Sequence, residues 1–200
     1  TGTENVAVGA FALDANTTGD RNIALGFGAL SFNTTGEKNI SIGRGSMGSN
    51  TTASNNTAVG ENALHTNSTG TKNVAVGALA LDANTTASFN TAIGFASLST
   101  NTTGIDNTAI GSNALDVNTT GADNVAVGAF ALDANTTGQK NVSIGRGSMG
   151  SNTTASNNTA VGENALFANT TGTDNTAVGR QALDTNTTGD KNCAFGVFAL

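Results

Sequence analysis

Apolar and polar positions recur along this chain with a fixed period of seventeen positions. Each copy begins with asparagine and carries an apolar side chain at its fourth position, glycine at its fifth and leucine or methionine at its ninth. From Asn5 to Asn192, every seventeenth residue is this first asparagine, so twelve copies follow one another and the last is truncated. A fixed period of this kind predicts a linear stack in which each unit contacts only its neighbours.

Two stretches of each copy are predicted to be extended. Positions 1 to 5 hold a β-branched or apolar run closed by glycine, which is typical of a short strand. The Ala-Leu segment at positions 8 and 9 is the second expected strand, and Asn-Thr-Thr-Gly at positions 12 to 15 has the residues of a turn. The sequence therefore predicts an all-β fold, a parallel β-solenoid (β-roll) of about twelve 17-residue coils with two short strands per coil. We expect one continuous repeat array over residues 1–200, part of a longer fibre.

The charged residues separate the outside of the coil from its scaffold. All 22 of them fall at positions 6, 10, 16 or 17. Because an unpaired charge at a buried site costs several kcal/mol, the other positions are expected to face the core, the ladders or a neighbouring chain. We expect the core to contain the apolar residues of positions 4 and 9 and the small residues of positions 3 and 8. Representative residues of the expected structural ladders are Asn5, Asn22, Asn39, Asn56 and Asn73 at position 1, Gly9, Gly26, Gly43 and Gly60 at position 5, and Leu13, Leu30 and Leu64 at position 9.

Composition narrows the classes of function. The net charge is −6 and the eight lysines and arginines are scattered, which argues against nucleic-acid binding. Aromatic residues make up only 4% of the chain, so a conventional globular core is not expected, and no apolar run approaches the ~18 residues of a membrane span. The single cysteine, Cys193, stands at position 2, and we expect it to act as a small buried hydrophobe.

The residues that could support catalysis are few. The only histidine, His65, stands at a variable position and is expected to face solvent. Five aspartates share position 10 but recur in too few adjacent copies to predict a carboxylate pair or a calcium ladder, and the position-5 glycines are isolated rather than clustered as in a phosphate-binding loop. We therefore expect no enzyme activity, no cofactor and no metal.

Most phenylalanines stand at variable corner positions. We expect them to pack on one another or on an adjacent chain, and a sticky lateral surface for a host, a matrix or neighbouring filaments is the alternative interpretation. The candidate lateral-contact residues are Phe11, Phe27, Phe32, Phe95, Phe130, Phe167 and Phe198.

Asn-Thr-Thr at positions 12 to 14 admits two interpretations. Each full copy offers an N-x-Ser/Thr acceptor for N-glycosylation, which belongs on exposed loops of secreted proteins, but a ladder of stacked asparagines explains the same residues. A lesser hypothesis is that the regularly spaced threonines bind ice, although adjacent threonines are expected to point to different sides. The candidate glycosylation residues are Asn16, Asn33, Asn50, Asn67, Asn84, Asn101, Asn118, Asn135, Asn152, Asn169 and Asn186.

The motif Asn-Thr-Ala-Val-Gly-x-x-Ala-Leu, found at Asn56–Leu64 and Asn175–Leu183, resembles the head repeats of trimeric autotransporter adhesins of the YadA type. Similar repeats occur in phage tail-fibre-like proteins. The resemblance covers the whole chain, but the repeat here is longer, and Asn-Thr-Thr fills the extra length. It implies a left-handed parallel β-roll, association of three chains, and display of an adhesive surface outside the cell.

Together these observations predict an extracellular or cell-surface structural fibre segment, a rod or stalk that displays variable corner residues. Its expected partners are copies of itself in a homotrimer, with a host or matrix surface or attached glycans as further candidates. The alternative is a single-chain solenoid that stacks end to end into a filament.

Overall fold

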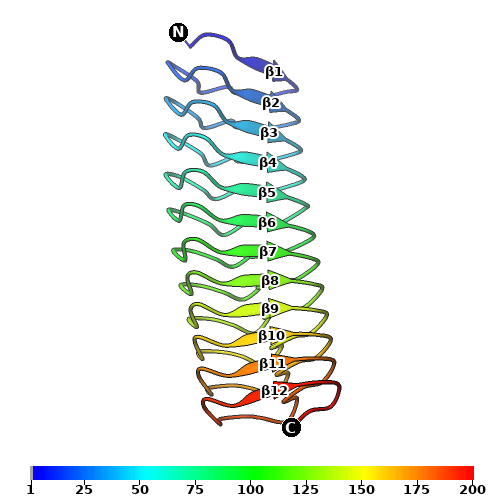
Figure 1. Ribbon diagram of the computed structural model, residues 1–200. Helices are drawn as coiled ribbons and strands as arrows, with labels where there is room; N and C mark the ends of the chain where they lie inside the picture. Colours follow the sequence, from blue (N-terminus) through cyan, green and yellow to red (C-terminus); the bar gives the residue numbers. More distant parts are fainter. Residues whose placement is uncertain (1) are drawn as a thin grey trace.

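A computed structural model describes residues 2–200 as one stack of coils, a β-solenoid in which the chain rises by one coil with each sequence repeat (Figure 1). Within these residues each coil contributes one three-residue strand to a single parallel sheet whose order follows the sequence. The two ends of the chain lie at opposite ends of the stack. The strands are β1 (Val6–Val8), β2 (Ile23–Leu25), β3 (Ile40–Ile42), β4 (Thr57–Val59), β5 (Val74–Val76), β6 (Thr91–Ile93), β7 (Thr108–Ile110), β8 (Val125–Val127), β9 (Val142–Ile144), β10 (Thr159–Val161), β11 (Thr176–Val178) and β12 (Cys193–Phe195).

Strand pairing keeps the sequence period without a slip. In β8 and β9, for example, Val125 lies opposite Val142 and Val127 lies opposite Ile144, so each residue pairs with its counterpart in the next repeat. Equivalent residues of successive coils therefore stack above one another at the inter-strand spacing of ~4.8 Å. The predicted all-β parallel solenoid with a 17-residue coil is confirmed.

The prediction of a second strand in each coil is wrong. Between positions 7 and 9 the chain turns, because the residues at both positions adopt left-handed backbone angles: φ is 57° at Phe130 and 55° at Leu132. Position 17 turns in the same way, with φ of 57° at Lys140. A strand requires φ near −120°, so positions 7 to 9 form a corner rather than an extended segment. The corners still hydrogen-bond from coil to coil, as Leu132 N–H does to the Ser148 carbonyl oxygen at 2.9 Å.

The core is narrow and consists of small side chains around one row of large ones. Ala126 at position 3, Ala131 at position 8 and Leu132 at position 9 are all fully buried. The same row contains Leu30 and Leu64, which are fully buried, and Leu13, which is partly buried in the first coil. Each coil thus buries little apolar surface, and hydrogen bonds supply much of the specificity of stacking.

Position 4 does not belong to this core, contrary to the prediction. Alternate residues of a strand point to opposite faces, so when Ala109 of β7 points inward, Thr108 and Ile110 must point outward; Ile110 is 38% exposed. The same alternation corrects the expectation for Cys193, which stands at position 2 of β12 and is exposed rather than buried.

Two ladders of buried asparagines run the length of the solenoid. At position 1, the Asn39 side-chain oxygen accepts the Asn56 backbone N–H at 3.0 Å, and the Asn56 Nδ2 donates to the Gly70 carbonyl oxygen at 2.9 Å. The same backbone contact joins Asn5 to Asn22, Asn22 to Asn39, and Asn56 to Asn73. No buried side-chain nitrogen or oxygen of residues 2–200 is left without a partner.

The position-5 glycines stack against one another. A Cβ added to Gly111 would lie 2.6 Å from the carbonyl carbon of Gly128, and φ of 134° at Gly111 is a conformation that other residues rarely adopt. Gly9, Gly26, Gly43 and Gly60 form the earlier part of this row, each pressed against the next glycine along. Glycine is therefore required at position 5 by both space and backbone angle.

Candidate functional site

The outward side of the sheet is a continuous apolar surface. We call the side chains at positions 2 and 4 of β1–β12 the outer sheet face. They are valine, isoleucine, leucine, threonine, cysteine and phenylalanine, and none is charged. Because the strands are in register, these side chains form two parallel rows along the rod, and isoleucines at position 4, such as Ile42 and Ile144, remain nearly 40% exposed.

This face is large for a surface that remains in water. If each of its 24 side chains exposes on the order of 50 Å², the total is roughly 1,200 Å², whereas the largest apolar patch of a typical monomer is about 300–600 Å². A stable interface buries about 800 Å² on each partner. The outer sheet face therefore has the size and composition of an interface core.

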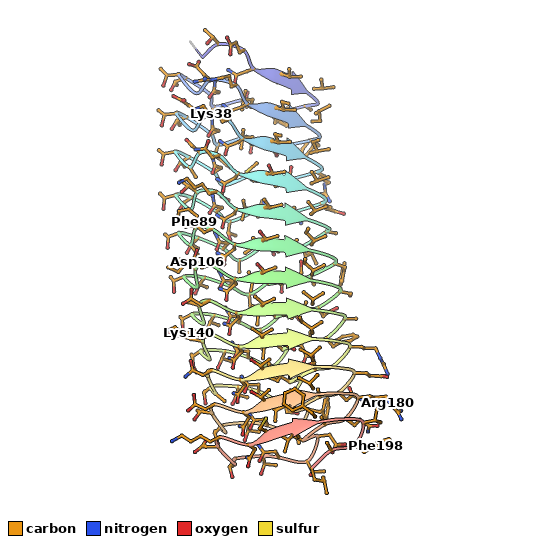
Figure 2. All side chains as sticks on the ribbon, viewed as in Figure 1. Lys38, Phe89, Asp106, Lys140, Arg180 and Phe198 are labelled. Atoms are coloured by element: carbon orange, nitrogen blue, oxygen red, sulfur yellow. The ribbon has the colours of Figure 1, made fainter. Side chains whose placement is uncertain are left out.

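Charged residues line one side of the face along most of its length and the other side in five of the twelve coils. Figure 2 shows Lys38 and Lys140, at position 17, along one side of the strands, and Arg180, at position 6, on the other. On the position-6 side, Arg146 pairs with Glu163 at 2.7 Å, and the equivalent pair Arg44–Glu61 is separated by 3.0 Å. An apolar centre with a charged, solvated border is the usual anatomy of a protein interface.

The seven phenylalanines predicted as lateral contacts are all exposed, but the structure does not gather them into one surface. Phe11 and Phe27 pack edge to face with ring centroids 5.5 Å apart, and Arg180 lies over the Phe198 ring at 4.7 Å. A single groove is lined by both Phe27 and Phe32, while the sixth, eighth and tenth coils carry Phe95, Phe130 and Phe167. Two exposed phenylalanines fell outside the predicted set: Phe89, under Lys72, and Phe195 on the outer sheet face.

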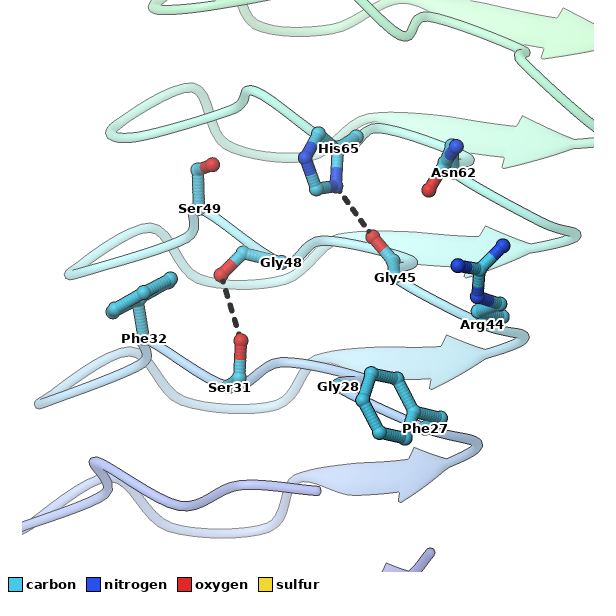
Figure 3. A pocket seen from close by; sticks show the side chains of 10 residues that line it. All are labelled: Phe27, Gly28, Ser31, Phe32, Arg44, Gly45, Gly48, Ser49, Asn62 and His65. Carbon is cyan, nitrogen blue, oxygen red and sulfur yellow. Dashed lines mark hydrogen bonds between the residues drawn. The ribbon is translucent and has the colours of Figure 1, made fainter. Parts of the chain in front are cut away.

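A groove of about 320 Å³ opens on the corner side of the second to fourth coils. Figure 3 shows Phe32 and Ser49 on one side of it, Phe27 and Arg44 on the other, and His65 with Asn62 above. Gly28, Gly45 and Gly48 form its floor. We call this the coil 2–4 groove.

His65 lies in this groove, half-buried rather than fully facing solvent as expected. Its Nδ1 is 2.7 Å from the Gly45 carbonyl oxygen. A carbonyl oxygen only accepts, so Nδ1 must carry a proton, and Nε2 takes no part in this bond. The ring lies over Gly48, where a Cβ would be 2.9 Å from its Cε1. The sequence contains a signal for this placement, because position 10 of the preceding coil is a glycine, Gly48, which leaves room for the His65 ring.

The position-10 aspartates are distributed over the same side of the rod, at Asp14, Asp82, Asp116, Asp133 and Asp184. Only two of them stand in neighbouring coils, and there burial, with the Asp116 carboxylate adding to it, raises the pKa of Asp133. Burial alone raises the pKa of Asp82. Across residues 2–200, no three carboxylate, imidazole or thiol groups come together in a way that would hold a metal ion.

The asparagines of the N-x-Ser/Thr acceptors lie inside the coil, which agrees with the ladder interpretation and not with exposed glycosylation sites. Nine of the eleven are fully buried, and only Asn16 and Asn186, near the ends, are partly buried. The Nδ2 of Asn135 donates to Asn118 Oδ1 at 2.8 Å and to the Gly138 carbonyl oxygen at 3.1 Å. A glycan on Nδ2 would replace one of its two N–H donors and has no space beside a fully buried side chain, so N-glycosylation does not fit this fold at the buried positions.

The two threonines of each turn have different surroundings. At position 13, the Thr136 hydroxyl donates to the Thr153 carbonyl oxygen of the next coil at 3.0 Å, so this row is part of the scaffold. At position 14, every threonine from Thr18 to Thr188 is exposed. Only one row of free hydroxyls therefore faces water on this side, which does not favour ice binding by paired threonine rows.

The part of the chain described by the structure contains no helix with the length and apolar character needed to cross a bilayer. Comparison with known proteins found no matching family model, no matching curated protein and no matching solved structure. The resemblance of Asn56–Leu64 to adhesin head repeats is therefore a hypothesis drawn from sequence pattern, while the β-solenoid is a property of the structure.

Proposed function

We propose that this chain is a structural segment of an extracellular or cell-surface fibre, without enzyme activity, in which copies of the chain associate side by side as a homotrimer and display their corner residues to other surfaces. The observation that carries the proposal is the outer sheet face, an uncharged, mainly apolar surface that runs the full length of the rod.

The internal structure suits a passive mechanical role. Each coil is joined to the next by strand pairing, by two asparagine ladders and by the position-13 threonine hydroxyls. The same contacts recur at every step, so the rod is a stack of equivalent units whose length scales with the number of copies. The blocks Asn39–Leu64 and Asn141–Leu166 differ only at Ile40 and Val142, which is the mark of lengthening by duplication.

Lateral association explains the outer sheet face better than any internal role. Two parallel apolar rows allow each chain to contact two neighbours around a common axis, one through position 2 and one through position 4. Closed cyclic symmetry would keep the coils of all three chains level and leave no apolar row in water. The corner positions 6, 7, 10 and 11 would then point away from the axis, where they are available to a host or matrix surface.

A charge on the outer sheet face tests this arrangement. Val127 stands at position 4 of β8, near the middle of the rod, and is only partly covered in the single chain. Val127→Glu is therefore expected to leave the coil folded but to place one carboxylate per chain close to the common axis. We expect sedimentation equilibrium to show the mass falling from about three chains to one 19.7 kDa chain, with an unchanged β-type circular dichroism spectrum.

The matched control is Ala129→Glu, two residues further along the same coil. Position 6 already carries glutamate at Glu61 and Glu163, so this variant adds the same charge at a border position. It is expected to sediment like the unmodified protein. Equal effects of the two variants, or an unmodified chain that is monomeric at micromolar concentration, would contradict the proposal, and a mass that grows without limit would favour end-to-end filaments.

A further inference from the structure

The coil 2–4 groove is specific to one of two nearly identical parts of the chain. The duplicated block places the same floor glycines and the same arginine at Gly45, Gly48 and Arg44 as at Gly147, Gly150 and Arg146. What differs is what surrounds them. The second copy has Ala129, Phe130, Asp133, Ala134 and Phe167 where the first has Phe27, Gly28, Ser31, Phe32 and His65.

Glycine at position 28 creates the hollow and is not required by the backbone. Gly28 has φ of 65°, but the same left-handed position holds phenylalanine in other coils, with φ of 59° at Phe11 and 57° at Phe130. A Cβ at Gly28 would meet nothing within 4 Å. The missing side chain therefore leaves open space at Gly28, which the larger side chain occupies in coils such as those of Phe11 and Phe130.

Several polar groups of the groove have no partner among residues 2–200. The Asn62 side-chain amide and the Ser49 hydroxyl make no hydrogen bond there, and the Nε2 of His65 is free because Nδ1 holds the Gly45 carbonyl oxygen. Figure 3 shows Ser49 beside Phe32 on one side of the groove, Phe27 on the other side, and His65 with Asn62 above them. The groove thus combines two apolar ring surfaces with donors and acceptors that water alone satisfies.

The charge of the groove favours a neutral ligand. Arg44 is neutralised by Glu61 at 3.0 Å, and the chain as a whole carries −6. The Arg44–Glu61 pair offers hydrogen-bond donors and an acceptor, and a ligand hydroxyl can use both because it donates and accepts. A volume of about 320 Å³ is at the lower end for small-molecule sites and corresponds to one or two rings.

We propose that the coil 2–4 groove binds a neutral pyranose ring of a glycan, with its C–H groups against Phe27 and Phe32 on the two sides of the groove and its hydroxyls on Asn62, Ser49 and His65. The site lies on the corner side of the rod and not on the outer sheet face, so it is independent of whether chains associate. A surface glycan of a host or of a neighbouring cell would supply such a ring.

Titration of the full chain with D-glucose, D-galactose, D-mannose and N-acetylglucosamine, followed by protein-detected NMR, tests this proposal. At least one of these sugars is expected to bind saturably, with a dissociation constant on the order of 1 mM, and to shift resonances of Asn62 and His65. N-acetylneuraminic acid and phenylalanine amide serve as the acidic and the peptide-like probes, and both are expected to bind more weakly.

Gly28→Phe is the decisive variant, because the fold already accepts phenylalanine at this position in Phe11 and Phe130. It is expected to stay folded, with a small fall in melting temperature from the positive φ at this position, and to abolish sugar binding. Phe32→Ala is expected to weaken binding about tenfold. Asn164→Ala, the counterpart of Asn62 in the second copy, is the control and should bind like the unmodified chain. Lack of saturable binding by all four neutral sugars, stronger binding of either other probe, or full binding by Gly28→Phe would overturn the proposal.

Discussion

Removal of one rung from the position-1 asparagine ladder tests how the coils are held together. Asn107, in the middle of the rod, donates from Nδ2 to Asn90 Oδ1 at 3.2 Å and to the Gly121 carbonyl oxygen at 2.9 Å. Its Oδ1 accepts the backbone N–H of Asn124 and the Asn124 Nδ2, both at 3.1 Å. Asn107→Ala removes all four bonds in a site that is fully buried.

The size of the effect depends on which groups lose their last partner. The Gly121 carbonyl oxygen still accepts from Asn118, and the Asn124 Nδ2 still donates to the Gly138 carbonyl oxygen. The backbone N–H of Asn124, by contrast, has no other acceptor in the described chain. An unsatisfied buried N–H costs about 1–3 kcal/mol and each further lost bond about 0.5–1.5 kcal/mol. We expect Asn107→Ala to lower the free energy of unfolding by about 4 kcal/mol.

Chemical unfolding followed by far-ultraviolet circular dichroism, at one fixed protein concentration, measures this loss. Long repeat arrays can unfold in parts, so hydrogen exchange of the Asn124 amide provides the local readout and is expected to lose its protection. Asn192→Ala is the control: within the described residues the Asn192 oxygen accepts no bond, and its Nδ2 donates only to Asn175. The control should cost about 1 kcal/mol. Equal effects of the two variants, or a loss below about 0.5 kcal/mol for Asn107→Ala, would refute the ladder argument.

Three further predictions concern other positions of the coil. Gly111→Ala should prevent correct stacking, because its Cβ would lie 2.6 Å from Gly128. Gly28→Ala should lower the melting temperature only slightly, because its Cβ would meet nothing within 4 Å and the positive φ alone costs about 1 kcal/mol; similar melting temperatures of the two variants would contradict this. Burial raises the pKa of Asp133 above its ordinary 3.8, so the folded chain holds that proton more tightly, and the ionised carboxylate costs stability above the folded pKa. Asp133→Asn should therefore raise the melting temperature at pH 7, and this gain should fade below pH 3.8. An equal gain at pH 3 would refute the prediction. Intact-mass measurement of native protein should give the mass of the bare polypeptide, and a hexosamine located on Asn135 by peptide mapping would contradict the burial of its Nδ2.

The period and the strand of each coil could be predicted from the sequence because they depend on local chemistry repeated without error. Asparagine at position 1 and glycine at position 5 are invariant, and the β-branched run between them has a strong strand preference. The stack follows from the fixed spacing alone. The prediction of a second strand is wrong because bulky residues such as Leu132 and Phe130 rarely adopt left-handed backbone angles. The residues around them contain no sequence signal for such angles.

The prediction of which strand side chains point inward is also wrong, although the sequence contains the signal for the correct direction. An apolar side chain at position 4 was assigned to the core, but a strand cannot point positions 3 and 4 to the same side. Position 3 is always alanine or serine, while positions 2 and 4 tolerate threonine, Cys193 and Phe195. Strict limits on size mark the inside of a narrow coil, and variation marks its outside.

The coil 2–4 groove could not be located from sequence, because its residues come from three coils and meet only through stacking. Gly28 and Gly48 belong to different coils, and both stand at positions where other coils carry large side chains. Whether these glycines lie next to Phe32 and His65 depends on which side of the corner each repeat position occupies. That geometry depends on the left-handed residues that the sequence did not reveal.

The solution mass of the unmodified chain tests the central claim most directly, namely that the outer sheet face joins copies of the chain side by side. Sedimentation equilibrium at micromolar concentration should give three chains of 19.7 kDa, about 59 kDa, and the value should not change as concentration rises. Small-angle scattering should then give a rod about 55 Å long, the length of one solenoid at ~4.8 Å per coil. A mass of 19.7 kDa with the apolar rows left in water would contradict the account.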